Sequence, residues 1–116
     1  MIESSAQFIQ GIVPFSGRGY QSPLPLGPEM GYVVPADRRA QLIYFRAGNS
    51  SSDMIYVALM RDGKLMRSFP LGAKSAMHVP LAVVEDLFPE TKLTLLVGAP
   101  EGVSGTLVLD LGLMEI

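Results

Sequence analysis

Residues 54–69 read Met-Ile-Tyr-Val-Ala-Leu-Met-Arg-Asp-Gly-Lys-Leu-Met-Arg-Ser-Phe and contain the strongest structural signal of the chain. Asp62-Gly63 can supply the two positive-φ residues of a type I′ turn, and it lies between two runs of strand-forming residues. The stretch therefore predicts a β-hairpin. With a two-residue turn, the register would pair Leu59 with Met66 and Tyr56 with Phe69.

In this register the hairpin is apolar on both faces. A sandwich strand normally has one solvent-facing side, so a ribbon with two apolar sides needs a second cover. We expect that cover to be the Pro-rich segment 15–28 or another chain. Arg67, on an otherwise apolar face, would lie at the rim or meet a partner's carboxylate. The sequence thus predicts self-association through an interface made of Tyr56, Val57, Leu59, Met66, Arg67 and Phe69.

The rest of the chain is also typical of β structure. Twelve Gly and nine Pro residues interrupt it too often for helices of ordinary length. We predict a single antiparallel β-sandwich domain over residues 1–116, with about eight strands in an Ig-like or jelly-roll-like arrangement. At most one short helical turn is expected, at 85–88. The predicted strands are Gln7–Val13, Tyr32–Val34, Ala40–Arg46, Met54–Met60, Leu65–Phe69, Ala76–Val83, Lys92–Val97 and Thr106–Met114.

Composition excludes several classes of function. The chain has no Cys and one His, which removes disulfides, thiol nucleophiles, thiolate zinc sites and multi-histidine metal sites. Nine basic against eleven acidic residues disfavour binding to a nucleic acid backbone. The sequence shows neither a signal peptide nor an apolar stretch long enough to cross a bilayer. We therefore expect a cytoplasmic protein with no catalytic residues, no cofactor or metal, and neither nucleic acid nor membrane as partner.

Two polar features are candidates for ligand binding. Residues 49–53, Asn-Ser-Ser-Ser-Asp, offer a row of hydrogen-bonding groups that would suit sugar hydroxyls, although such residues also satisfy their own backbone in turns. His78 is the one side chain whose ordinary pKa lies near neutrality, but an isolated His lacks the partners that acid–base catalysis needs. The candidate ligand-binding residues are Asn49, Ser51, Asp53 and His78.

Charge is divided unevenly along the chain. Residues 38–74 hold seven basic and two acidic residues, whereas residues 75–116 hold six acidic residues and one basic residue. These opposite charges either pair within one chain or orient a partner subunit. The sequence as a whole predicts a non-catalytic interaction or assembly module, either a homo-oligomer or a small accessory subunit of a larger complex. The alternative is a carbohydrate-like small-molecule binding module that uses the polar turn 49–53. A third hypothesis is an enzyme that uses His78 or a pair of carboxylates, which would need a concave pocket at those groups.

Overall fold

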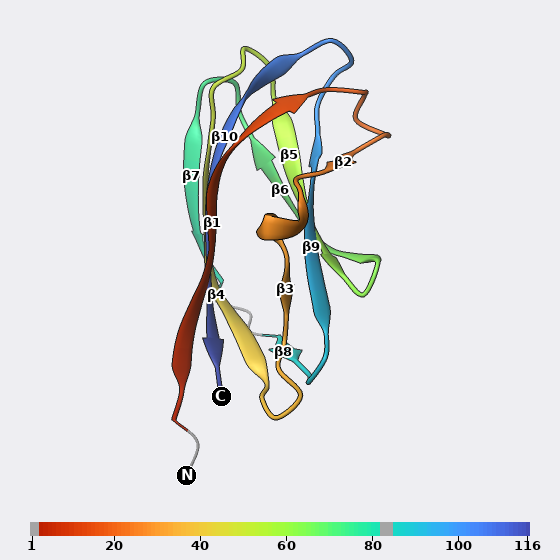
Figure 1. Cartoon of the computed structure of the whole chain (residues 1–116). Helices are drawn as coiled ribbons and strands as arrows, with labels where there is room; N and C mark the ends of the chain where they lie inside the picture. Colours follow the sequence, from red (N-terminus) through yellow and green to blue (C-terminus); the bar gives the residue numbers. More distant parts are fainter. Residues whose placement is uncertain (1–2, 82–84) are drawn as a thin grey trace.

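The computed structural model describes residues 3–81 and 85–116, which form two antiparallel β-sheets packed face to face (Figure 1). In sheet A the strand order is β1-β10-β4-β7, and β8 also pairs with β4. In sheet B the order is β2-β9-β5-β6, and β3 also pairs with β9. The strands of sheet A are β1 (Ser5–Ser16), β4 (Ala40–Asn49), β7 (Ala76–Pro80), β8 (Asp86–Leu87) and β10 (Ser104–Glu115). Those of sheet B are β2 (Leu24–Pro25), β3 (Tyr32–Val33), β5 (Ile55–Arg61), β6 (Lys64–Leu71) and β9 (Lys92–Gly98).

The strand pairs are nested along the chain. The first strand pairs with the last, β2 and β3 pair with β9, β4 pairs with β7 and β8, and β5 pairs with β6. A chain paired in this way is one long hairpin wrapped over itself, which is the jelly-roll arrangement. The prediction of an all-β antiparallel sandwich is confirmed, and the strand order is that of a jelly roll.

The core lies between the two sheets. Its centre is the row of alternating leucines on β10, Leu107, Leu109, Leu111 and Leu113, each at most 2% exposed. From β4 in sheet A, Phe45 stacks on Phe69 of β6 in sheet B, with ring centroids 3.9 Å apart and planes 7° from parallel. Period-two alternation thus places one side of each long strand in a shared apolar layer.

The hairpin at 54–69 forms, but its predicted register is wrong beyond the first pairs. Asp62 and Gly63 have φ values of 51° and 81°, as a type I′ turn requires. A bulge at Met66 then shifts the pairing by one residue, so that Leu59 faces Arg67 and Val57 faces Phe69. The shift brings Val57, Leu59 and Phe69 onto the side of the hairpin that faces the core.

The helical turn expected at 85–88 is not formed. Asp86 and Leu87 instead make the short strand β8 along β4, because this extended path buries the Leu87 side chain completely. A 3₁₀ turn, η1 (Pro28–Met30), occurs in the Pro-rich region, with Pro28 at the first helical position. The Pro-rich segment adds β2 to the edge of sheet B next to β9. The predicted strand at 76–83 ends at Pro80, and residues 82–83 lie outside the described residues.

The basic and acidic segments of the chain form ion pairs with each other. Four ion pairs of the described residues each join a basic residue of segment 38–74 to an acidic residue of segment 75–116. They are Arg39–Asp86 (3.5 Å), Arg46–Asp110 (2.5 Å), Arg61–Glu85 (3.3 Å) and Arg67–Glu85 (3.5 Å). Of the two interpretations of the charge pattern, these pairs support the one in which the segments attract each other within a single chain. No helix in the described ranges is long and apolar enough to cross a membrane.

Candidate functional site

The outer face of sheet A carries large apolar side chains that face away from the core. Phe8 is 56% exposed, Ile12 73% and Val108 51%. Ile12 on β1 pairs directly with Val108 on β10, and Phe8 lies four residues before Ile12 on the same side of β1. These three residues, here called the apolar strip, follow the two strands that lie side by side in Figure 1.

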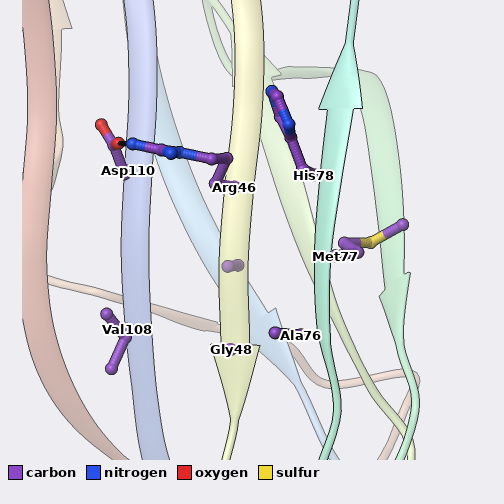
Figure 2. A pocket seen from close by; sticks show the side chains of 8 residues that line it. Arg46, Gly48, Ala76, Met77, His78, Val108 and Asp110 are labelled. Carbon is purple, nitrogen blue, oxygen red and sulfur yellow. Dashed lines mark hydrogen bonds and ion pairs between the residues drawn. The ribbon is translucent and has the colours of Figure 1, made fainter.

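A polar row crosses the same face between Phe8 and the Ile12–Val108 pair. The register aligns Gln10 of β1, Asp110 of β10, Arg46 of β4 and His78 of β7 across four neighbouring strands. Asp110 is the centre of this row, since its carboxylate accepts hydrogen bonds from Gln10 Nε2 at 3.1 Å and from Arg46 Nε at 3.1 Å. Tyr44 donates its hydroxyl proton to the same carboxylate at 2.9 Å. Figure 2 shows Arg46 reaching from its strand toward Asp110.

These contacts favour the ionised carboxylate. Partial burial of Asp110 acts to raise its pKa, but hydrogen bonds from Arg46, Gln10 and Tyr44 outweigh that effect and hold the pKa below its ordinary value. Desolvation and the hydrogen bond to Asp110 raise the pKa of Tyr44. Tyr44 is therefore a neutral hydroxyl donor at physiological pH, and the charge of Asp110 is balanced by Arg46.

Tyr44 is positioned by a glycine on the neighbouring strand. Gly112 of β10 pairs with Tyr44, and a Cβ at position 112 would lie 2.2 Å from Tyr44 Cε2. The ring can lie over the strand because this atom is missing. In this position it contacts the Arg46 guanidinium, whose Cζ lies 5.2 Å from the ring centroid, and the edge of His78, with centroids 5.9 Å apart.

A shallow groove of about 660 Å³ lies next to the polar row. Two small residues, Gly48 on β4 and Ala76 on β7, pair with each other and leave space between Val108 and His78 (Figure 2). A second hollow of about 410 Å³ shares Gly48, Ala76 and Val108 with the groove. It adds polar side chains at one end, namely Asn49, Ser50, Lys74, Ser75 and Thr106.

The candidate ligand residues of the 49–53 turn have mainly a structural role. Asn49 and Ser51 are each only 4% exposed. Asn49 Nδ2 donates to the carbonyls of Asp53 at 2.9 Å and Gly72 at 3.0 Å, and Ser51 Oγ donates to Asn49 Oδ1 at 2.8 Å. These hydrogen bonds stabilise the loop and use the polar groups of both side chains, as expected of turn residues. Asp53 is exposed. His78 lines the groove, and Asn49 lies at the second hollow.

Three of the six residues assigned to an interface lie in the core. Val57 and Leu59 are 0% exposed and Phe69 is 5% exposed, because the bulge at Met66 places Phe69 on the side of Val57 and Leu59, which faces sheet A. These three side chains pack in the core of their own chain, so their assignment to a surface is wrong.

The other three assigned residues are half-buried. Tyr56 lies over Gly98 and donates its hydroxyl proton to the Tyr20 carbonyl. Met66 packs against the core, and Arg67 pairs with Glu85. The hairpin therefore makes much of its apolar contact with its own chain.

The apolar strip was missed by the sequence analysis. Its signal is present in residues 5–16, Ser-Ala-Gln-Phe-Ile-Gln-Gly-Ile-Val-Pro-Phe-Ser, which contain no charged residue. Phe8 and Ile12 alternate there with Ile9 and Val13, so this strand, like the hairpin, has large apolar groups on both sides.

No protein-family model and no curated protein matches the sequence. Among solved structures, the chain is similar to a chain in a structure of infectious bursal disease virus, Gx strain, with 11% sequence identity and a TM-score of 0.46. The match covers 97% of this chain and 36% of the viral chain, so this chain spans little more than a third of its length. A likeness of this size carries no information on function.

Proposed function

We propose that the chain is a non-catalytic association module that forms a homo-oligomer through the β1 side of sheet A, where the apolar strip lies. The observation that carries the proposal is the apolar strip, in which Phe8, Ile12 and Val108 are each more than half exposed on two paired strands. Single exposed apolar residues are ordinary, but several on the same face of two paired strands are typical of contact surfaces.

The polar row, which lies between Phe8 and the Ile12–Val108 pair, is also compatible with a contact surface. A carboxylate that must lose water on association is costly when unpaired. Asp110 already holds three partners from its own chain, Gln10, Tyr44 and Arg46, so a partner could cover it at lower cost.

An energy comparison favours a symmetric contact. Burying the exposed parts of Phe8, Ile12 and Val108 contributes roughly 1 kcal/mol each. Association costs about 4 kcal/mol or more in lost translational and rotational freedom, so a single strip, at roughly 3 kcal/mol, would not offset it. In a two-fold dimer both copies contribute their strips to the contact, which favours a second copy of this chain as the partner.

The test is the mass in solution, measured by light scattering over a dilution series, for the wild type and two matched variants. Ile12→Lys places a charge on the apolar strip and should give a folded monomer. Leu65→Lys is the control, since Leu65 is also highly exposed, at 61%, but lies on the hairpin. A wild type that is monomeric at every concentration, or an Ile12→Lys variant that associates as the wild type does, contradicts the proposal.

A second candidate function, binding of a small carbohydrate-like ligand, is supported by the groove over Gly48 and Ala76. The groove borders His78 and continues to the polar side chains of Ser50 and Thr106, which suit hydroxyl groups. A binding sugar should raise the unfolding temperature by mass action, and Ala76→Leu, which fills the floor, should abolish the rise. An unchanged unfolding temperature across a panel of mono- and disaccharides removes this candidate.

A further inference from the structure

The strands at the sheet edges differ in how well they are protected. Edge strands usually carry charges, prolines or short lengths that prevent pairing with another chain. The edge strand β6 has Lys64 and Pro70, β7 has five residues and ends at Pro80, and β2 has two residues, one of which is proline. In contrast, β1 has twelve residues and no charge, and its one proline lies near its end.

The backbone of β1 is available for a further ladder. The Gly17 N–H donates to the Val103 carbonyl at 2.6 Å, which continues the β1–β10 ladder and identifies odd-numbered residues as those bonded to β10. Even-numbered residues of β1 therefore direct their N–H and C=O groups to the open edge. Pro14 is even-numbered, so the N–H that proline lacks would have pointed to the open edge. The β1–β10 ladder therefore loses no hydrogen bond. In the described part of the chain, no hydrogen bond reaches the open-edge backbone groups of Phe8, Gln10 or Ile12.

We propose that β1 pairs with β1 of a second copy, antiparallel about a two-fold axis at Gln10, which joins two copies of sheet A into one continuous sheet. This inference rests on the proposed function and names the contact by which the association occurs. Even-numbered residues must face even-numbered residues, since paired side chains share a face and these residues carry the free backbone groups.

The side chains select the register among those that the backbone allows. With Gln10 opposite the partner's Gln10, Phe8 faces Ile12 of the partner, and the two apolar strips become continuous across the axis. About six backbone hydrogen bonds would form between positions 8 and 12. Moving the axis to Gly11 would instead place Gln10 opposite Ile12 and Phe8 opposite Pro14. The first register matches apolar with apolar and amide with amide.

Charges agree with this arrangement. The nearest charge to the axis is Asp110, which is balanced by Arg46, so two copies would not repel each other there. The charged residues that flank β1 have opposite signs, with Glu3 before the strand and Arg18 after it. Antiparallel pairing would bring Glu3 of each copy toward Arg18 of the other.

A proline at the axis tests the pairing without changing the apolar strip. Gln10→Pro removes the open-edge N–H and the side-chain bond to Asp110, whereas the control Gln10→Ala removes only the side-chain bond. Light scattering should show a dimer for the wild type, and association at least tenfold weaker for Gln10→Pro than for Gln10→Ala. If Gln10→Pro is folded by circular dichroism and dimerises as tightly as Gln10→Ala, edge pairing is overturned while association itself stands. A wild type that stays monomeric at every concentration overturns both proposals.

Cysteine cross-linking tests the register and does not depend on the folding of the proline variant. The chain has no cysteine, so an introduced one is the only thiol. In the proposed register the two Gln10 Cα atoms lie about 5.5 Å apart, within the range of a disulfide. The two Ala6 Cα atoms lie about 27 Å apart. Under mild oxidation Gln10→Cys should give a disulfide-linked dimer and Ala6→Cys should not. Equal cross-linking of the two variants, or none at position 10, overturns the register.

Discussion

Replacement of Gly112 by alanine should destabilise the protein through the ring of Tyr44. Gly112 lies in β10 and its φ is outside the left-handed region, so the backbone accepts alanine. The added Cβ, however, would lie 2.2 Å from Tyr44 Cε2, 2.7 Å from Cζ and 2.8 Å from Cδ2. Carbon atoms do not approach this closely, so the ring must leave. It would then lose its hydrogen bond to Asp110 and its contact with Arg46.

The expected size follows from two opposing effects. Displacing a packed side chain typically costs about 1–3 kcal/mol. Replacing glycine by alanine restores about 0.4–1 kcal/mol, because the unfolded chain loses freedom. The free energy of unfolding should therefore fall by about 1–2 kcal/mol, which for 116 residues is roughly 4–8 °C in Tm. Urea denaturation of the monomeric Ile12→Lys background would measure it free of association.

A double-mutant cycle isolates the ring from other effects. In a Tyr44→Ala background, Gly112→Ala should be neutral or stabilising, which gives a coupling energy of about 1–3 kcal/mol. Gly48→Ala is the matched control on the same face, since its Cβ would lie 3.8 Å from that of Ala76, an ordinary contact distance. Additive effects at positions 44 and 112, or an equal loss from Gly48→Ala, would refute the reasoning.

Three further predictions concern the core, a buried carboxylate and acid stability. Leu59→Ala should lower the free energy of unfolding by about 2–5 kcal/mol in urea titrations, because Leu59 is fully buried; a loss below 1 kcal/mol would place it at a surface. Tyr32→Phe should cost about 1–3 kcal/mol in the same assay, since it removes a hydroxyl donor from the buried Glu115 carboxylate. The lowered pKa of Asp110 means that its stabilising effect is present above the unfolded pKa of about 3.9 and is lost as pH falls through the folded-state pKa. Asp110→Asn should therefore reduce the pH dependence of the urea midpoint below about pH 4. The same pH dependence in the variant and the wild type would contradict this.

The sequence correctly predicted structural features that are determined by residues adjacent along the chain. The Asp62-Gly63 turn is such a feature, because two adjacent residues with positive φ determine it. The bulge at Met66 is not local. It lets Phe69 stack on Phe45 of the other sheet and accompanies the pairing of Arg67 with Glu85. Both partners are distant in sequence, so the hairpin residues alone could not indicate the shifted register.

The error at 85–88 has the same origin. Acidic residues before Pro89 are a local signal for a helical turn. Burial of Leu87 against β4 requires an extended path, and this tertiary contact outweighs the local preference. The turn at 49–53 shows the reverse case. Its hydrogen bonds run mostly among near neighbours, and the interpretation as turn chemistry was available from the residues alone.

The candidate contact surface depends on strand order, which local apolar content does not reveal. The hairpin was predicted to be the interface because both of its faces are apolar, yet β5 has a neighbour on each side and directs Val57 and Leu59 into the core. The strand β1 has a milder excess, but it lies at an edge and its outward side carries Phe8 and Ile12. An apolar residue on an edge strand has no neighbouring strand to shield it on one side, so the same side chain exposes more surface there. A charge-free strand of this length is therefore a stronger indication of association when it is the first strand of a nested β fold, because nesting pairs the first strand with the last and leaves its other side open.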